Sequence, residues 1–546
     1  MPEMLVGGHI VAKQLQAEGV SCLFTLCGGH VAPIYDGCLR YGIDIVDTRH
    51  EQAAVHAADG WARLTRKAGV AILTAGPGVT DGVTGVANAM QAGVPIVVLG
   101  GASELRFKGK GALQEMDQTP LLSAVCKASF TATDPKRLAE YVRTAFRIAE
   151  SGVPGPVFIE LPFDVLTAQV TDPYFPPPAV AWPRQPGDPD AVAATAQLID
   201  GAQKPILFVG SQVYWDGAAG ELRRLAERAN IPVFMNAMGR GSLEATHPLS
   251  FANARKLAFR STDLVVVVGT PLDFRVGYGA GINQQAKIVQ IDRNPHVIGA
   301  NRPVASAILG DARSVLGQLA DAVAAAPPAR AAWVSEMRAS EEKKSAEIMV
   351  HAMSDASPIN HYRLGRAIAE AIDDDTIVIG DGGDCVAFGS KVIPRSKPGT
   401  WMDPGPLGCL GIGAPFAIAA KKLDRARKVL ILSGDGSFGL NGFDLDTCLR
   451  FDLPVTVVVG NDAAWGQIRG PQVMIFGAER APATKLWPTR YDRVVEALGG
   501  VGYHVEEAAK LTPTIKEALA QDKVSCVNVP LDPGFVVKAG LAKLTV

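Results

Sequence analysis

The chain has 546 residues, of which 48% are hydrophobic and 20% are charged, and it contains 57 glycines. At roughly 100–200 residues per domain this length predicts about three domains. The composition is typical of parallel α/β layers joined by tight loops. Lys and Arg total 53 against 55 Asp and Glu, so net charge excludes a strongly basic nucleic-acid surface or membrane-binding surface. We expect small molecules and copies of the same chain as partners.

The cysteines and the apolar runs exclude several other classes of protein. The eight cysteines form no CxxC pair and have no regular spacing, so neither a disulfide framework nor a zinc site is expected. The start of the chain, MPEMLVGGHI, lacks a basic region followed by a long apolar run. No apolar run approaches the roughly 20 residues of a membrane span. We therefore expect a cytoplasmic protein that does not associate with a membrane.

Two changes in composition divide the chain into three blocks. The first is a Pro-rich stretch around 171–190, and the second begins with an Ala/Pro segment at 324–330 and continues through a charged, helix-forming stretch. We assign domains to residues 1–172, 188–328 and 355–546. Each block repeats short β-branched runs that end in glycine and are followed by amphipathic segments. This alternation predicts an α/β fold of three doubly wound parallel-sheet domains, with ligands beyond the carboxyl ends of the strands.

The strongest chemical signal is the segment KVLILSGDGSFG together with the later VTVVVGNDAAW. It predicts two strands, each ending in a polar turn, with a helix between them. Backbone N–H groups at the start of that helix can hold a diphosphate, and the residues concerned are Gly434, Gly436 and Ser437. Asp435 offers a hard oxygen ligand, and Asn461 and Asp462 at the second strand end offer the further oxygen that Mg²⁺ prefers. The alternative is an ordinary turn with an Asx cap.

The spacing resembles the diphosphate-and-magnesium motif of thiamine-diphosphate enzymes, which begins GDG and ends with a pair of asparagines. By their numbers, Asp435 and Asp462 are 27 positions apart. The second asparagine of the family motif is here Asp462, which adds a negative charge beside the diphosphate. The resemblance implies thiamine diphosphate and Mg²⁺ as cofactors. It also implies that Asp435, Asp462, the backbone carbonyl of Ala464 and the neighbouring Asn461 form the metal site.

A carboxylate in the first block matches the family's acid–base residue. The predicted strand in GIDIVDTRH ends where Glu51 begins an Ala-rich helix. In the family a glutamate at this junction hydrogen-bonds the aminopyrimidine ring of the cofactor and promotes removal of a proton from its reacting carbon. Taken alone, Glu51 would be interpreted as a first-turn carboxylate favoured by the helix dipole. The neighbouring motifs favour the catalytic interpretation.

Glycine-rich segments supply those neighbouring motifs. Gly76 begins a GPG turn like that of the family, and the loop Gly28, Gly29, His30 resembles the one that borders the reacting carbon. In PLGCLGIGAP, the resemblance implies that the Gly408 carbonyl accepts the cofactor's exocyclic amine. Leu410 then replaces the methionine that keeps the two cofactor rings bent, a steric task. We also place Gly383 and Asp384, which follow the strand predicted in DTIVIGDGG, at the cofactor.

The resemblance covers essentially the whole chain and is strongest to acetolactate-synthase-like proteins, among them the 2-hydroxyacyl-CoA lyases. The strings LCGGHVAPIY, VDTRHE and GALQEMDQ carry it. It implies an acyl-CoA substrate that is cleaved to formyl-CoA and an aldehyde or ketone. Gln114 would donate a hydrogen bond to a substrate oxygen, and His30 would act as proton donor or oxyanion partner. The alternative for His30 is a loop histidine that caps backbone groups.

Several alternatives stay open. Acetolactate-synthase-type carboligation is one, and oxalyl-CoA-decarboxylase-type decarboxylation is another, although Leu113-Gln114 replaces that enzyme's Tyr-Glu pair. A flavin oxidase or nicotinamide dehydrogenase is disfavoured, because no dinucleotide fingerprint opens any block. The presence of Glu51 argues against a non-catalytic relative.

The resemblance also bears on the middle domain and on assembly. Relatives hold ADP, FAD or nothing in the middle domain, where Arg275 and Asp292 are either contacts for a nucleotide or structural residues. The family builds each site from two chains, so we expect a homodimer or homotetramer.

Overall fold

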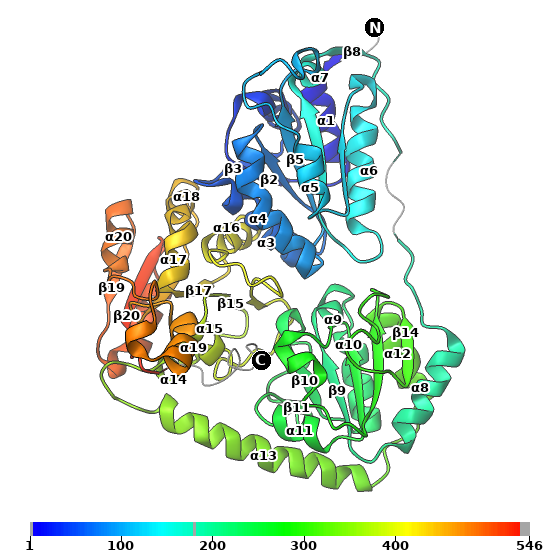
Figure 1. Cartoon of the computed structure of the whole chain (residues 1–546), viewed down its shortest axis with the longest axis vertical. Coiled ribbons are helices and arrows are strands. Elements are labelled where there is room, and N and C mark those ends of the chain that lie inside the picture. Colours follow the sequence, from blue (N-terminus) through cyan, green and yellow to red (C-terminus); the bar gives the residue numbers. More distant parts are fainter. Residues whose placement is uncertain (1–3, 178–181, 536–546) are drawn as a thin grey trace.

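The computed structural model describes residues 4–177 and 182–535. Three six-stranded sheets, each flanked by helices, form three units that follow one another along the chain (Figure 1). Within each of these sheets, every pair of neighbouring strands is parallel. The predicted α/β class with three doubly wound parallel sheets is confirmed. Each sheet is built from one of the three predicted residue ranges, although the boundaries themselves stay predictions.

The first unit has the strand order β3-β2-β4-β5-β7-β6. Its strands are β3 (Asp44–Asp47), β2 (Cys22–Thr25), β4 (Gly69–Leu73), β5 (Ile96–Ala102), β7 (Val157–Pro162) and β6 (Ala128–Thr131). Its helices are α1 (Gly7–Ala17), α2 (Ala32–Tyr41), α3 (Glu51–Thr65), α4 (Pro77–Ala92), α5 (Gln118–Ser123), α6 (Leu138–Glu150) and α7 (Phe163–Thr167). A small antiparallel pair, β1 (Met4–Val6) with β8 (Gln169–Thr171), joins the two ends of this unit. The central strands are apolar throughout because helices cover both faces of the sheet.

The middle unit has the strand order β11-β10-β9-β12-β13-β14. Its strands are β11 (Ser250–Phe251), β10 (Val233–Met235), β9 (Pro205–Val209), β12 (Leu264–Val268), β13 (Lys287–Asp292) and β14 (Ser306–Leu309). Its helices are α8 (Pro189–Gly201), α9 (Ser211–Trp215), α10 (Ala219–Ala229), α11 (Arg255–Ser261) and α12 (Ala312–Ala322). The charged stretch after it forms one long helix, α13 (Ala329–Ala352), which runs beneath the middle unit to the third (Figure 1).

The third unit has the strand order β16-β15-β17-β18-β20-β19. Its strands are β16 (Trp401–Met402), β15 (Ile377–Asp381), β17 (Val429–Gly434), β18 (Thr456–Asn461), β20 (Ser525–Pro530) and β19 (Val501–His504). Its helices are α14 (His361–Ala371), α15 (Asp384–Gly389), α16 (Gly413–Leu423), α17 (Asp435–Asn441), α18 (Leu445–Arg450), α19 (Gly466–Phe476), α20 (Tyr491–Leu498) and α21 (Leu511–Leu519). The predicted strand–turn–helix–strand order of the GDG segment is confirmed, with β17 ending at Gly434 and β18 ending at Asn461.

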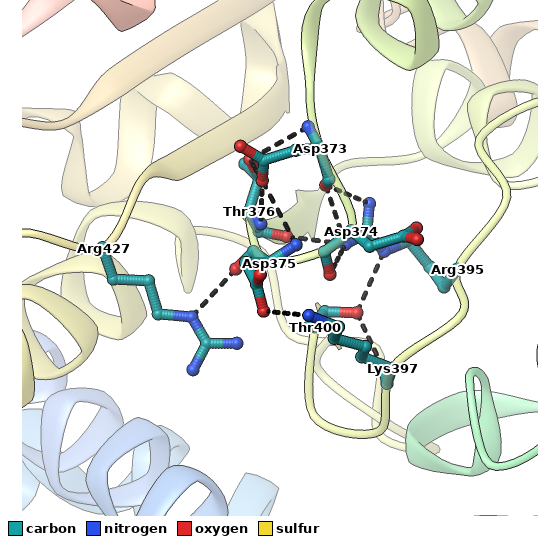
Figure 2. Close-up of polar contacts among 8 residues, drawn as sticks. All are labelled: Asp373, Asp374, Asp375, Thr376, Arg395, Lys397, Thr400 and Arg427. Carbon is teal, nitrogen blue, oxygen red and sulfur yellow. Dashed lines mark hydrogen bonds and ion pairs between the residues drawn. The ribbon is translucent and has the colours of Figure 1, made fainter.

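A polar network fixes the amino end of β15 (Figure 2). The half-exposed loop before this strand is closed by Asp373, whose carboxylate accepts from the backbone N–H and the hydroxyl of Thr376 at 2.8 and 2.7 Å. The buried guanidinium of Arg395 donates to the backbone carbonyls of Asp374 and Thr376 at 2.9 and 2.8 Å.

The first and third units pack together within the chain through α3 and α16 (Figure 1). Arg63 on α3, 2% exposed, forms an ion pair with Asp59 at 2.6 Å and donates to the Asp403 carbonyl at 2.8 Å. Its guanidinium also lies 5.0 Å from the ring centre of Phe416 on α16. In the parts of the chain that the structure describes, no helix is long and apolar enough to cross a membrane.

Candidate functional site

A cavity of about 220 Å³ lies at the carboxyl ends of β15, β17 and β18. Ten predicted site residues line it: Gly383, Asp384, Gly408, Leu410, Gly434, Asp435, Gly436, Ser437, Asp462 and Ala464. The other lining residues are His361, Cys385, Gly460, Trp465, Gly466, Gln467 and Ile468. The structure therefore brings this group of predicted residues together, while their roles stay predictions.

The GDG turn presents backbone donors beside a bulky ring. Gly434 pairs in register with Gly460 of the neighbouring strand, and α17 begins at Asp435. The Gly436 N–H donates to Asp435 Oδ1 at 2.8 Å. A Cβ on Gly436 would lie 2.4 Å from Cζ3 of Trp465, so only glycine fits there without movement of the indole. The glycine therefore lets the Trp465 ring pack directly on the backbone at the start of α17.

Three carboxylates face the cavity. Asp435 is 3% exposed and Asp384 is 6% exposed, and Asp435 Oδ2 and both Asp384 oxygens are buried with no hydrogen-bond partner. Burial, together with repulsion from Asp462, raises the pKa of Asp435 to about 7 and that of Asp384 to about 6. Burial raises the pKa of Asp462 to about 6. Among the described residues, no Lys or Arg lines the cavity. No described side chain therefore neutralises these charges, and a divalent cation fits this donor set.

The protein side chains do not form a complete metal cage. Among residues 4–177 and 182–535, no group of three or more His, Cys, Asp or Glu side chains could hold a metal ion by itself. Mg²⁺ is commonly bound by one or two carboxylates plus phosphate oxygens and waters. The residues present therefore fit a cation that shares its ligands with a diphosphate.

Asn461 is placed differently from the other predicted metal ligands. Its amide Nδ2 donates to the Thr489 carbonyl at 2.8 Å and to Asn528 Oδ1 at 3.1 Å, and its Oδ1 accepts from the Ala463 N–H. It is 6% exposed and does not line the cavity. These contacts favour a structural role for Asn461, which leaves Asp462 as the side-chain ligand that this strand end can supply.

A buried aspartate positions the loop that carries Gly408 and Leu410. Asp381, at the end of β15, accepts from the N–H groups of Gly411 and Gly413, each at 2.8 Å. Gly408 and Gly411 have φ of 70° and 82°, a backbone conformation that favours glycine. The sequence reasoning did not single out Asp381, although its place in the string IGDGGD at a strand end was a usable signal.

Glu51 lies in the first unit, where the structure places it as the first residue of α3. It is 7% exposed, and burial together with repulsion from Asp81 raises the pKa of its carboxyl group. The GPG turn adjoins it, because a Cβ on Gly78 would lie 3.5 Å from Glu51 Oε1. A buried carboxyl group with a raised pKa holds its proton more readily than an exposed one, which suits a group that exchanges a proton.

His30 and Gln114 lie close to the same turn. A Cβ on Gly76 would be 2.8 Å from the Gln114 carbonyl oxygen, and one on Gly101 would be 2.7 Å from Cβ of His30. His30 Nδ1 lies 3.4 Å from Thr74 Oγ1, and burial lowers the pKa of this histidine. Gln114 has a φ of 59°, in the left-handed region. Of the predicted loop glycines, Gly28 packs on Thr74, whereas Gly29 faces open space.

Gln118 was not predicted, yet it holds this group together. Its buried amide accepts from the Gly76 N–H at 2.9 Å and donates to the Gly101 carbonyl at 2.9 Å and to Glu160 Oε1 at 3.0 Å. The turn at Gly76 is thereby fastened to the ends of β5 and β7. Its position at the end of the string GALQEMDQ was the available signal.

The two groups of predicted residues are separate within one chain. The lining of the GDG cavity contains no residue from the first unit, whereas Glu51, His30, Gly76 and Gln114 all belong to that unit. One described chain therefore presents two half-sites, each at the carboxyl edge of its own sheet.

A larger cleft of about 1010 Å³ lies between the middle unit and the other two. Both predicted nucleotide contacts line it. Arg275 forms an ion pair with Asp273 at 2.6 Å, and Asp292 accepts from Gln212 Nε2 at 2.6 Å and from the Asn294 N–H at 2.7 Å. Each side chain thus already has a partner within the protein. These contacts are compatible with a nucleotide-binding role and with a purely structural role.

Comparison with known proteins agrees with this geometry. Residues 5–121 match the model for the N-terminal TPP binding domain of thiamine pyrophosphate enzymes, residues 192–319 match the central domain, and residues 381–529 match the C-terminal TPP binding domain. The chain belongs to the thiamine pyrophosphate enzyme family.

Its relatives define the group within that family. The chain is 37% identical over 531 residues to the acetolactate synthase large subunit IlvG of Mycobacterium tuberculosis, covering 96% of both chains. It is 36% identical over 561 residues to 2-hydroxyacyl-CoA lyase 2 of Caenorhabditis elegans, covering 94% of this chain and 87% of the relative. For the Homo sapiens 2-hydroxyacyl-CoA lyase 2 the identity is 35% over 544 residues, covering 91% and 84%. The protein is therefore a thiamine-diphosphate-dependent enzyme of the acetolactate synthase and 2-hydroxyacyl-CoA lyase group.

Proposed function

We propose that this enzyme is a thiamine-diphosphate- and Mg²⁺-dependent carbon–carbon lyase that cleaves 2-hydroxyacyl-CoA to formyl-CoA and an aldehyde or ketone. The observation that carries the proposal is the cavity at Gly434–Ser437, where backbone donors and the buried, unpartnered Oδ2 of Asp435 face one space. When bound, the cofactor would supply a carbon nucleophile that adds to the substrate carbonyl and a positively charged ring that accepts the electron pair of the bond being broken.

The chain's own groups would divide the remaining work. Ser437 would offer its N–H to the diphosphate at the start of α17, while the Gly436 N–H holds the Asp435 carboxylate. Asp435 and Asp462, with the carbonyl of Ala464, hold Mg²⁺ against it. Leu410 keeps the cofactor rings bent, and the carbonyl of Gly408 orients the amine.

The acid–base groups come from the first unit. Glu51 holds the proton that it exchanges with the aminopyrimidine ring, in surroundings where burial favours its protonated form. Gln114 donates a hydrogen bond to a substrate oxygen, and His30 holds or returns a proton there.

We infer a homodimer or homotetramer in which Glu51 of one chain faces the diphosphate cavity of another. This inference rests on the separation of the two half-sites within one chain and on the first unit's absence from the cavity lining.

An acyl-CoA substrate also requires cations for its phosphates. The exposed loop before Gln114 carries Arg106, Lys108 and Lys110. Arg106 and Lys110 lie 4.8 and 6.0 Å from the ring centre of Phe107, which is 42% exposed. Arg106 forms an ion pair with Glu104. We propose this loop as the CoA-contacting segment, because the exposed Lys108 and Lys110 can bind phosphate groups.

Acetolactate-type carboligation is the second candidate, because an acetolactate synthase is 37% identical to this chain over 96% of its length. Oxalyl-CoA decarboxylation is the remaining reaction to test. The experiment is incubation with thiamine diphosphate, Mg²⁺ and one of three substrates, a 2-hydroxyacyl-CoA, pyruvate or oxalyl-CoA, with products measured by mass spectrometry. Formation of formyl-CoA and an aldehyde or ketone from the 2-hydroxyacyl-CoA supports the lyase. Formyl-CoA and CO₂ formed only from oxalyl-CoA would replace it with the decarboxylase, and acetolactate as the sole product would replace it with the synthase.

A further inference from the structure

Asp384 differs from the other buried carboxylates of the third unit because neither of its oxygens has a hydrogen-bond partner. It begins α15, and its side chain is 6% exposed. Both its oxygens are buried. Asp381, the last residue of β15, has two backbone N–H partners at 2.8 Å. A buried carboxylate without partners is costly, so a group that binds it is expected in the working enzyme.

The position of Asp384 relative to Asp462 indicates the charge of that group. A Cβ on Gly466 would lie 2.5 Å from Asp462 Oδ2 and 3.1 Å from Asp384 Oδ2. The two carboxylates therefore approach one point from the ends of two different strands, and the glycine leaves that point open. Because the described part of the lining contains no Lys or Arg, the two facing carboxylates and the nearby Asp435 favour a cation over any anion or neutral ligand.

We propose that Asp384 is a positioning residue for the divalent cation, which it reaches through a water molecule of the cation's coordination shell. The water link follows from the side chains, since no three His, Cys, Asp or Glu groups among the described residues could ligate one ion directly. Mg²⁺ usually keeps several of its waters, and carboxylates that hold such waters strengthen cation binding. The inference rests on the proposed function and adds to it a residue from a third strand end.

This arrangement has two opposite consequences for binding. A cation should be retained even without the cofactor, because three carboxylates attract it. Thiamine diphosphate should bind very poorly without a cation, because the same three carboxylates repel its diphosphate. Removing the charge of Asp384 should therefore weaken cation binding and strengthen cation-free cofactor binding. Loss of structure at this position would instead weaken both.

The test uses the purified full-length enzyme and its Asp384→Asn variant. Binding of Mn²⁺ without cofactor is followed by electron paramagnetic resonance, and binding of thiamine diphosphate in EDTA is followed by calorimetry. We expect Mn²⁺ affinity to fall at least tenfold and the cation-free cofactor affinity to rise about tenfold. The control is Cys385→Ala, which alters a neighbouring lining residue without changing charge and should leave both affinities within about twofold.

Equal changes in the two variants, unchanged affinities in Asp384→Asn, or a fall in both affinities of that variant would overturn the assignment of Asp384. Failure of the proposed function has a different signature. In that case the wild-type enzyme would not bind thiamine diphosphate even with saturating Mn²⁺, whatever its affinity for the cation alone.

Discussion

Asp435→Asn offers the sharpest test of the cavity, because the same carboxylate should destabilise the cofactor-free protein and be required when the cofactor binds. Burial and repulsion from Asp462 raise the pKa of Asp435 from 3.8 to about 7. The folded protein therefore binds this proton more tightly than the unfolded chain does. Binding of this proton therefore stabilises the folded protein fully below about pH 4. This stabilisation is lost as the pH rises through 7 and is absent at higher pH.

The magnitude follows from the size of that shift. At 1.36 kcal/mol per pKa unit, the charged form costs the folded state on the order of 2–4 kcal/mol at pH 8, after allowance for the interaction shared with Asp462. For a unit of this size the variant should unfold about 5–10 °C higher than the wild type at pH 8. The two proteins should unfold at nearly the same temperature at pH 4.

The assay is thermal unfolding of both proteins at the two pH values, with and without Mg²⁺ and thiamine diphosphate. At 100 times the dissociation constant, the ligands should stabilise the wild type by about 2.7 kcal/mol and leave the variant almost unchanged. The reasoning is refuted if the variant is no more stable than the wild type at pH 8 without ligands. It is equally refuted if the ligands stabilise both proteins alike.

Three further predictions concern the assembled site. Glu51→Gln should lower turnover by roughly 10²–10⁴-fold, while calorimetry should show near-normal cofactor affinity. If the variant keeps ordinary turnover, Glu51 is only a carboxylate at the start of a helix and has no catalytic role. Mixing and reassociating inactive Glu51→Gln and Asp435→Asn chains should restore activity. In a mixed dimer, one interface joins the intact Glu51 of one chain to the intact Asp435 of the other. A mixture that stays inactive would indicate that each site is built within one chain. The double variant Lys108→Glu, Lys110→Glu should raise KM for an acyl-CoA at least tenfold, with a smaller effect at high salt, whereas an unchanged KM would remove this loop from the substrate's path.

The sequence by itself determined the fold class and the chemistry of the strand ends. Strands and helices leave patterns in consecutive residues, which the sequence shows directly. The alternation of β-branched runs and amphipathic segments therefore predicted the three parallel sheets. The GDG turn could also be predicted, because Gly434, Asp435 and Gly436 are contiguous. Two short helices, α17 and α18, and the strand β18 then separate Asp435 from Asp462.

Only the tertiary structure decided which of the predicted residues share a cavity. Asn461 and Asp462 are adjacent in sequence, yet the amide of Asn461 is bound to Thr489 and Asn528, whereas Asp462 faces the cavity. The approach of Asp384 to Asp462 across Gly466, and the fastening of Gly76 by Gln118, likewise join residues far apart in the chain. Such long-range contacts depend on the order of the strands in the sheet and on which side chains remain without partners. Neither can be deduced from the spacing of residues along the sequence.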